Sequence, residues 1–97
     1  MKIINKELLD QFSRKNAQSI KPLQRWCERV VDAKWKTHIE LKADFPAADY
    51  VGLSRYVFNI KGNNYRVITV VTFITGLIII RFVGTHSEYD QINAKKI

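Results

Sequence analysis

The side chains best suited to chemistry on an anion lie in, or just after, a stretch of sequence that contains no acid. Residues 50–87 include neither Asp nor Glu. Arginine offers a planar fork of N–H donors that matches the oxygens of a phosphate group. A set of basic, imidazole and phenol groups with no carboxylate suits a phosphodiester better than a sugar or a peptide. The candidates are Arg55, Lys61, Arg66, Arg81, His86 and Tyr89.

Cleavage of RNA is the reaction that these residue types fit. A base must take the proton of the 2′-hydroxyl, an acid must protonate the departing 5′-oxygen, and cations must stabilise the charge of the phosphorane. We predict that Arg66 and Arg81 stabilise the phosphorane. His86 is then the acid or the base, and Tyr89 assists or positions the substrate. The residues predicted to bind the RNA are Arg55, Asn59 and Lys61.

Each candidate also has an ordinary structural interpretation. Arg55 and Lys61 fall near strand ends, where basic side chains are often solvated surface charges. Arg66 and Arg81 lie within apolar strands, so each needs either an acid from elsewhere in the chain or a phosphate as its partner. A histidine in a first helical turn is commonly structural. The sequence has no cluster of Asp, Glu, His or Cys at the spacing of metal ligands, so we expect neither a metal nor a cofactor.

Three runs rich in β-branched and aromatic residues must position these side chains. They span residues 55–61, 65–73 and 77–83. Gly62-Asn63 and Thr75-Gly76 separate them, and both dipeptides are hairpin signals. The sequence therefore predicts a three-stranded antiparallel meander.

The register of this meander decides where the basic residues point. A turn at Gly62-Asn63 pairs Asn59 with Arg66, which makes one face of the sheet apolar and the other basic. A two-residue loop at Thr75-Gly76 gives the last strand the matching parity. We expect all four basic residues to converge on one face, opposite an apolar face that includes Ile78, Ile80 and Phe82.

Two amphipathic helices are expected to cover the apolar face. A short strand at Lys2–Ile4 leads to a helix that we expect to begin at an N-cap, Asn5, and to end near Lys15. A second helix carries Pro22 in its first turn and has apolar residues at helical spacing. Residues 35–54 are less regular, and Ile39-Glu40-Leu41 reads as a brief extended piece.

A capping box follows the last strand. Thr85 and, three residues later, Glu88 predict the start of a short helix where the sheet ends. His86 and Tyr89 lie three residues apart on it, so both can face the same way at the rim of the basic face. His38 has no comparable neighbours in the sequence and is interpreted as a surface residue.

Composition narrows the class of protein. The 97 residues allow one domain, 1–97, and 46% hydrophobic residues provide enough apolar side chain for a core. A net charge of +7 predicts an anionic partner. The single cysteine, Cys27, and the lack of a signal-peptide pattern favour a reducing cytoplasm. The longest apolar stretch, residues 67–80, is too short to span a membrane, for which about 20 residues are needed.

Two segments of the chain resemble the HigB family of bacterial toxins, within the RelE/ParE superfamily of type II toxin–antitoxin systems. They are Val57-Phe58-Asn59-Ile60-Lys61-Gly62-Asn63-Asn64-Tyr65-Arg66-Val67-Ile68 and Ile80-Arg81-Phe82-Val83-Gly84-Thr85-His86-Ser87-Glu88-Tyr89-Asp90. The resemblance implies a RelE-like α+β fold, with an N-terminal helical hairpin packed on one face of a small antiparallel sheet and a short C-terminal helix. It also implies a ribosome-dependent endoribonuclease that cuts mRNA.

The same resemblance implies partners. These are the ribosome with its mRNA, a HigA-type helix-turn-helix antitoxin, and operator DNA only through the complex with that antitoxin; no membrane is implied. Two alternatives remain open from the sequence. One is a ParE-like toxin that acts on DNA gyrase, and the other is a non-enzymatic module that binds RNA or the ribosome.

Overall fold

Five strands form one sheet in the computed structural model, which describes residues 1–97. The strand order is β1-β5-β4-β3-β2, with β1 parallel to β5 and the other neighbouring pairs antiparallel. In chain order the elements are β1 (Lys2–Ile4), α1 (Glu7–Lys15), a 3₁₀ turn (Ala17–Ser19), α2 (Ile20–Asp32), α3 (His38–Asp44), β2 (Asp49–Gly52), β3 (Arg55–Ile60), β4 (Tyr65–Thr72), β5 (Leu77–Thr85) and α4 (His86–Tyr89).

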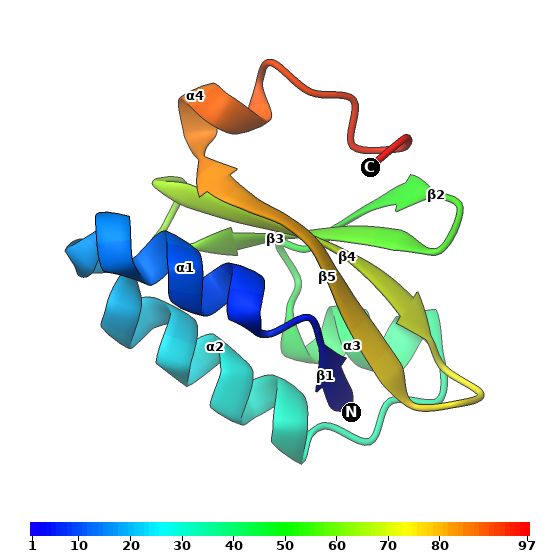
Figure 1. Ribbon diagram of the computed structural model, residues 1–97. Coiled ribbons are helices and arrows are strands. Elements are labelled where there is room, and N and C mark those ends of the chain that lie inside the picture. The colour runs from blue at the N-terminus through cyan, green and yellow to red at the C-terminus, as the bar shows by residue number, and fades with distance from the viewer.

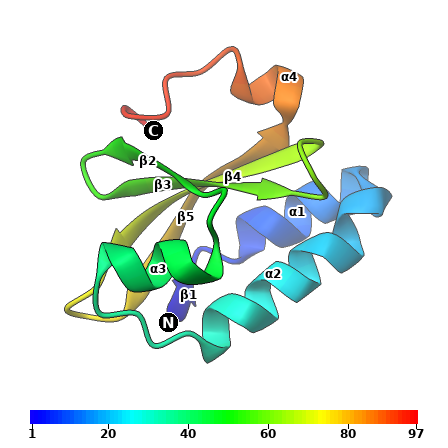
Figure 2. The same cartoon turned by 180° about the vertical axis from the view of Figure 1, so that it is seen from behind.

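The two faces of the sheet are covered by different parts of the chain. Helices α1, α2 and α3 lie on one side, while α4 and residues 91–97 lie on the other (Figures 1 and 2). The main core forms under the three helices, and its most deeply buried side chains include Val30, Leu41, Phe58, Val67, Ile78 and Ile80. The fold is therefore α+β with an N-terminal helical hairpin on one face, as predicted.

The predicted register of β3 and β4 is confirmed. Asn59 pairs with Arg66, and Arg55 pairs with Val70. Alternation along the strands then places Arg55, Val57, Asn59, Arg66 and Ile68 on the face away from the three helices. We call this the open face.

The end of β5 differs from the prediction because the strand contains a bulge. Thr69 pairs with Ile80 but its neighbour Ile68 pairs with Phe82, which leaves Arg81 as an extra residue. Ile78 and Ile80 lie in the core as expected, whereas Val83 packs against the core in place of Phe82. The prediction that Phe82 lies on the apolar face was wrong, because the bulge reverses the phase of the strand after Ile80.

The loop before β5 is also longer than predicted. Leu77 pairs with Thr72, so residues 73–76 form a four-residue loop. The parity is unchanged, which is why the core positions of β5 up to Ile80 were predicted correctly. The added outer strands β1 and β2 extend the three-stranded meander to five strands.

Two local predictions in the first half of the chain were wrong. Asn5 does not cap α1: it has a left-handed backbone, with φ of 65°, and its side-chain amide donates to the backbone of Ile80. The piece Ile39-Glu40-Leu41 belongs to helix α3, which Thr37 caps by accepting a hydrogen bond from the backbone of Glu40. The cap outweighs the weak extended preference of one short apolar pair. No helix of the structure combines the length and apolar character that crossing a membrane requires.

Candidate functional site

Arg66, Tyr89, His86 and Asp90 come together where β5 leads into α4. The guanidinium carbon of Arg66 lies 4.7 Å from the centroid of the Tyr89 ring, within the range of a cation–π contact. On the same helical turn, Nδ1 of His86 lies 3.0 Å from Oδ2 of Asp90. Both side chains of this second pair are about half exposed to solvent, at 46% and 57%. The structure thus brings three of the four predicted catalytic residues to one end of the open face.

The predicted capping box shapes the corner where β5 leads into α4, which holds Arg66, His86, Tyr89 and Asp90. The hydroxyl of Thr85 accepts a hydrogen bond from the backbone N–H of Glu88, and the carboxylate of Glu88 accepts one from the backbone N–H of Thr85. The backbone N–H of His86 donates to the carbonyl of Asn64 in the β3–β4 turn, at 3.1 Å. These bonds anchor α4 to the end of the hairpin that carries Arg66.

The guanidinium of Arg66 has N–H donors without close hydrogen-bond partners. Nη2 lies 3.5 Å from Oδ1 of Asn63, which is a long contact, and Nε is buried without a hydrogen-bond partner. Asn59 lies directly across the strand pair from Arg66. No carboxylate forms an ion pair with this guanidinium, so its charge is available to an anionic ligand.

Arg55 lies on the same face but at its other end. It is four residues along β3 from the residue opposite Arg66, a separation of about 13 Å along the strand at ~3.3 Å per residue. Its Nη1 and Nη2 donate to backbone oxygens of Leu53 and Ile97 at 2.9 and 3.0 Å, while Nε is buried without a partner. The open face therefore carries a guanidinium at each end.

The other two predicted basic residues do not join this arrangement. Lys61 occupies the β3–β4 turn with φ of 52°, and its ammonium donates to the side chain of Gln18 at the α1–α2 connection. Arg81, the extra residue of the bulge, is exposed and shares a shallow depression with Phe12 and Lys15 of α1. The expectation that four basic residues converge on one face was wrong, because a turn and a bulge redirect two of them.

Sequence reasoning missed Asp90 as a partner of His86, although the four-residue spacing on a helix was a readable signal. It also missed a second polar pair. His38 is exposed as expected, but its Nδ1 shares a 2.7 Å hydrogen bond with the hydroxyl of Tyr56 from β3. Burial, and then the neighbouring Tyr50, raise the pKa of Tyr56. Nothing in the sequence linked residues 18 positions apart.

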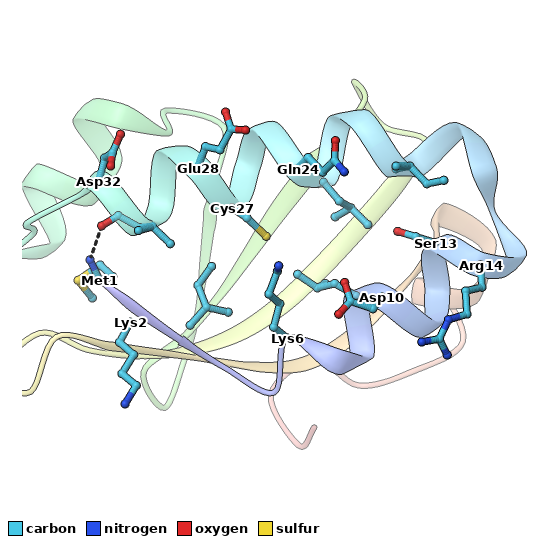
Figure 3. A pocket seen from close by; sticks show the side chains of 15 residues that line it. Met1, Lys2, Lys6, Asp10, Ser13, Arg14, Gln24, Cys27, Glu28 and Asp32 are labelled. Atoms are coloured by element: carbon cyan, nitrogen blue, oxygen red, sulfur yellow. Dashed lines mark hydrogen bonds between the residues drawn. The ribbon is translucent and has the colours of Figure 1, made fainter.

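A large groove lies away from this corner. It has a volume of about 1320 Å³ and runs between β1, α1 and α2, on the helix side of the sheet (Figure 3). Cys27 points into it toward Lys6. Burial raises the pKa of this thiol; Lys6 opposes the shift, while Asp10 and Glu28 add to it. None of the predicted catalytic residues lines this groove.

Comparison with known proteins identifies the family. A family model described as the HigB toxin, the RelE-like toxic component of a toxin–antitoxin system, matches residues 19–92. The chain belongs to this HigB toxin family. The matched part includes the open face, α4 and the whole corner that holds Arg66 and His86, so the resemblance seen in the sequence is confirmed.

Individual HigB relatives match along nearly the full chain. The mRNA interferase toxin HigB of Escherichia coli strain K12 is 34% identical over 97 residues, which cover 97% of this chain and 92% of the relative. The mRNA interferase HigB of Shigella flexneri matches to the same extent. The mRNA interferase HigB of E. coli O6:H1 strain CFT073 is 27% identical over 94 residues, or 95% and 91% of the two chains.

Proposed function

We propose that this protein is an mRNA endoribonuclease, the toxin of a toxin–antitoxin pair, which inhibits translation by cutting mRNA on the ribosome. The observation that carries the proposal is the Arg66–Tyr89 stack beside the His86–Asp90 pair on a face with no ion-paired arginine. The names of the relatives, mRNA interferases, support the same reaction.

In the proposed reaction the 2′-hydroxyl of the RNA attacks the adjacent phosphorus. The bond from phosphorus to the 5′-oxygen of the next nucleotide breaks, which leaves a 2′,3′-cyclic phosphate and a 5′-hydroxyl. The 2′-hydroxyl loses a proton and the departing oxygen gains one, so the step is balanced and needs no external co-reactant. Arg66 stabilises the additional negative charge of the phosphorane. This chemistry uses no metal, because a guanidinium supplies the positive charge.

His86 is the proposed proton-transfer group. Oδ2 of Asp90 lies 3.0 Å from Nδ1 of His86, so we propose that the carboxylate keeps the proton on Nδ1 and that Nε2 is the nitrogen that exchanges a proton with the RNA. Asp90 is thus a positioning residue. Tyr89 holds the guanidinium of Arg66 on one face of its ring, and we propose that its other face stacks on a nucleobase.

The other predicted residues receive more limited roles. Asn59 lies opposite Arg66, and Arg55 lies along the same face, so we propose that both bind the RNA backbone. Lys61 and Arg81 point elsewhere, and we propose that they contribute through the long-range field that attracts RNA and the ribosome. The proposed partners are a HigA-type antitoxin, the ribosome and mRNA, which places the site of action in the cytoplasm.

The test is induced expression of the wild-type protein with mapping of mRNA 5′ ends. We expect growth arrest and cuts in phase with codons, and loss of both when His86→Ala replaces the wild type. A variant that still folds and still arrests growth refutes the assigned site. DNA damage without mRNA cuts supports action on gyrase, and RNA binding with a steep salt dependence but no product at any concentration supports a non-enzymatic module.

A further inference from the structure

Two apolar side chains are buried on the open face, where no long helix covers them. Val57 and Ile68 face each other across β3 and β4, and their exposed fractions are 1% and 0%. Neither belongs to the core cluster under the three helices. The only parts of the chain on this side of the sheet are α4 and residues 91–97 (Figures 1 and 2). We call residues 91–97 the tail.

The tail crosses the open face from one arginine to the other. It leaves α4 beside Arg66, passes over the sheet and ends near the β2–β3 turn (Figure 1). Its side chains Ile92, Ala94 and Ile97 are half-buried, whereas the residues between them are exposed. At its far end the backbone oxygen of Ile97 accepts a hydrogen bond of 3.0 Å from Nη2 of Arg55.

The tail is only lightly attached to the sheet. Its remaining hydrogen bonds stay within the tail or return to α4: Ile92 donates to the carbonyl of Tyr89, and Lys96 donates to that of Asn93. The bond to Arg55 is the one hydrogen bond that joins it to the sheet. A segment that has no fully buried side chain and a single hydrogen bond to the sheet opens locally at low cost.

A backbone oxygen on a guanidinium resembles a phosphate oxygen on the same group. A phosphate offers several negatively charged oxygens that can bind the guanidinium fork at two points, whereas the tail provides one oxygen to Arg55. The unpartnered Nε atoms of Arg55 and Arg66 also remain for a ligand with more acceptor oxygens than the tail provides. RNA that contacts both arginines therefore needs the surface that the tail covers.

We propose that the tail is a built-in strap that covers the RNA-binding face in the free protein and competes with RNA for Arg55. This inference rests on the proposed function and adds regulation to the same site. Because only the open form accepts RNA, the observed dissociation constant equals the intrinsic constant divided by the open fraction. Any change that weakens the tail's contacts with the sheet then tightens RNA binding, up to the limit at which the tail is always open.

The test uses tail variants that leave every proposed catalytic residue in place. Ile92→Asn together with Ile97→Asn removes apolar contacts, and a chain ending at Gln91 removes the strap; Gln91→Asn is the control at an exposed tail position. The probe is a fluorescent oligoribonucleotide with 2′-O-methyl groups, which lacks the attacking hydroxyl and is not cut. We expect anisotropy titrations to give roughly tenfold tighter binding for the first two variants and no change for the control.

A second measurement requires no RNA. Methyl NMR signals of Val57 and Ile68 are expected to be shielded from a soluble paramagnetic agent in the wild type and broadened by it in the shortened chain. Equal or weaker RNA affinity of the shortened, folded chain overturns the strap while leaving the proposed function intact. A failure of the wild type and all variants to bind the oligoribonucleotide overturns the competition between the tail and RNA, whereas the proposed function is judged separately by the mapping of mRNA 5′ ends.

Discussion

Substitution of Arg66 separates a catalytic role from a structural one. In Arg66→Ala the phosphorane loses its principal cation, and removal of one such donor typically slows the chemical step by about 10²–10³-fold. Arg66→Lys retains a charge but not the planar fork or its stacking on Tyr89, so we expect it to recover only part of the rate. We expect the cleavage rate to decrease in the order Arg, Lys, Ala at this position.

Substitution of Arg66 by alanine should cost little stability. The stack on Tyr89 contributes about 0.5–2 kcal/mol, from an exposed to a desolvated site. Against this, substitution removes a buried Nε that has no partner, and such a group costs about 1–3 kcal/mol. The two terms have opposite signs, so the net change lies between a loss of about 1 kcal/mol and a gain of about 2.5 kcal/mol. In a domain of this size the melting temperature should therefore fall by no more than about 8 °C.

The assay is single-turnover cleavage of mRNA in a reconstituted translation reaction, with thermal unfolding followed in parallel. Arg81→Ala is the matched control, since it removes the same charge from the bulge beside α1, and we expect less than about a tenfold loss of rate. An Arg66→Ala protein that folds and cuts at more than a tenth of the wild-type rate would falsify the assignment. A larger loss of cleavage rate in Arg81→Ala than in Arg66→Ala would also contradict the assignment of Arg66.

Three further outcomes are expected. Asp90→Asn should slow cleavage about tenfold, because His86 loses the carboxylate that orients it, and Asp90→Glu should recover part of the rate; an unchanged rate argues against the pair. Burial disfavours the thiolate of Cys27 and raises the pKa of this thiol. The stability that the protonated thiol contributes is therefore complete below the pKa of the unfolded thiol and is lost as the pH rises through the higher pKa of the folded state. Cys27→Ala should flatten the decline in the urea-unfolding free energy above about pH 8.5 relative to wild type. Gly84→Ala would place a Cβ 2.5 Å from the Phe82 ring and should destabilise the fold by about 1–3 kcal/mol, and a double-mutant cycle with Phe82→Ala should show less than additive loss.

The sequence was most informative where one local signal decided the structure. The turn at Gly62-Asn63 predicted the pairing of Asn59 with Arg66, and the Thr85–Glu88 box predicted α4. Both are local patterns: a hairpin's register follows from its turn, and a cap follows from two side chains three residues apart.

The predictions failed where backbone geometry, or contacts between residues distant in the sequence, determine the position of a side chain. The bulge at Arg81 leaves no mark in the alternation, because Ile80, Phe82 and Val83 are all apolar and fit either phase. The left-handed backbone of Lys61 depends on the turn conformation rather than on residue type. The bond between His38 and Tyr56 joins α3 to β3, and no sequence pattern links elements that meet only in the folded chain.

The bulge that made the prediction for the end of β5 wrong also shapes the candidate site. Without the extra residue, alternation would set Val83 opposite Arg66, and a branched side chain would lie beside the guanidinium. With the bulge, Gly84 takes that position, and the Phe82 ring lies over it within 3 Å of where a Cβ would be. A glycine there leaves Arg66 free of a branched side chain from the neighbouring strand, so α4 can carry Tyr89 onto the guanidinium. One inserted residue thus moves Arg81 away from the open face and makes room for the stack that we assign to catalysis.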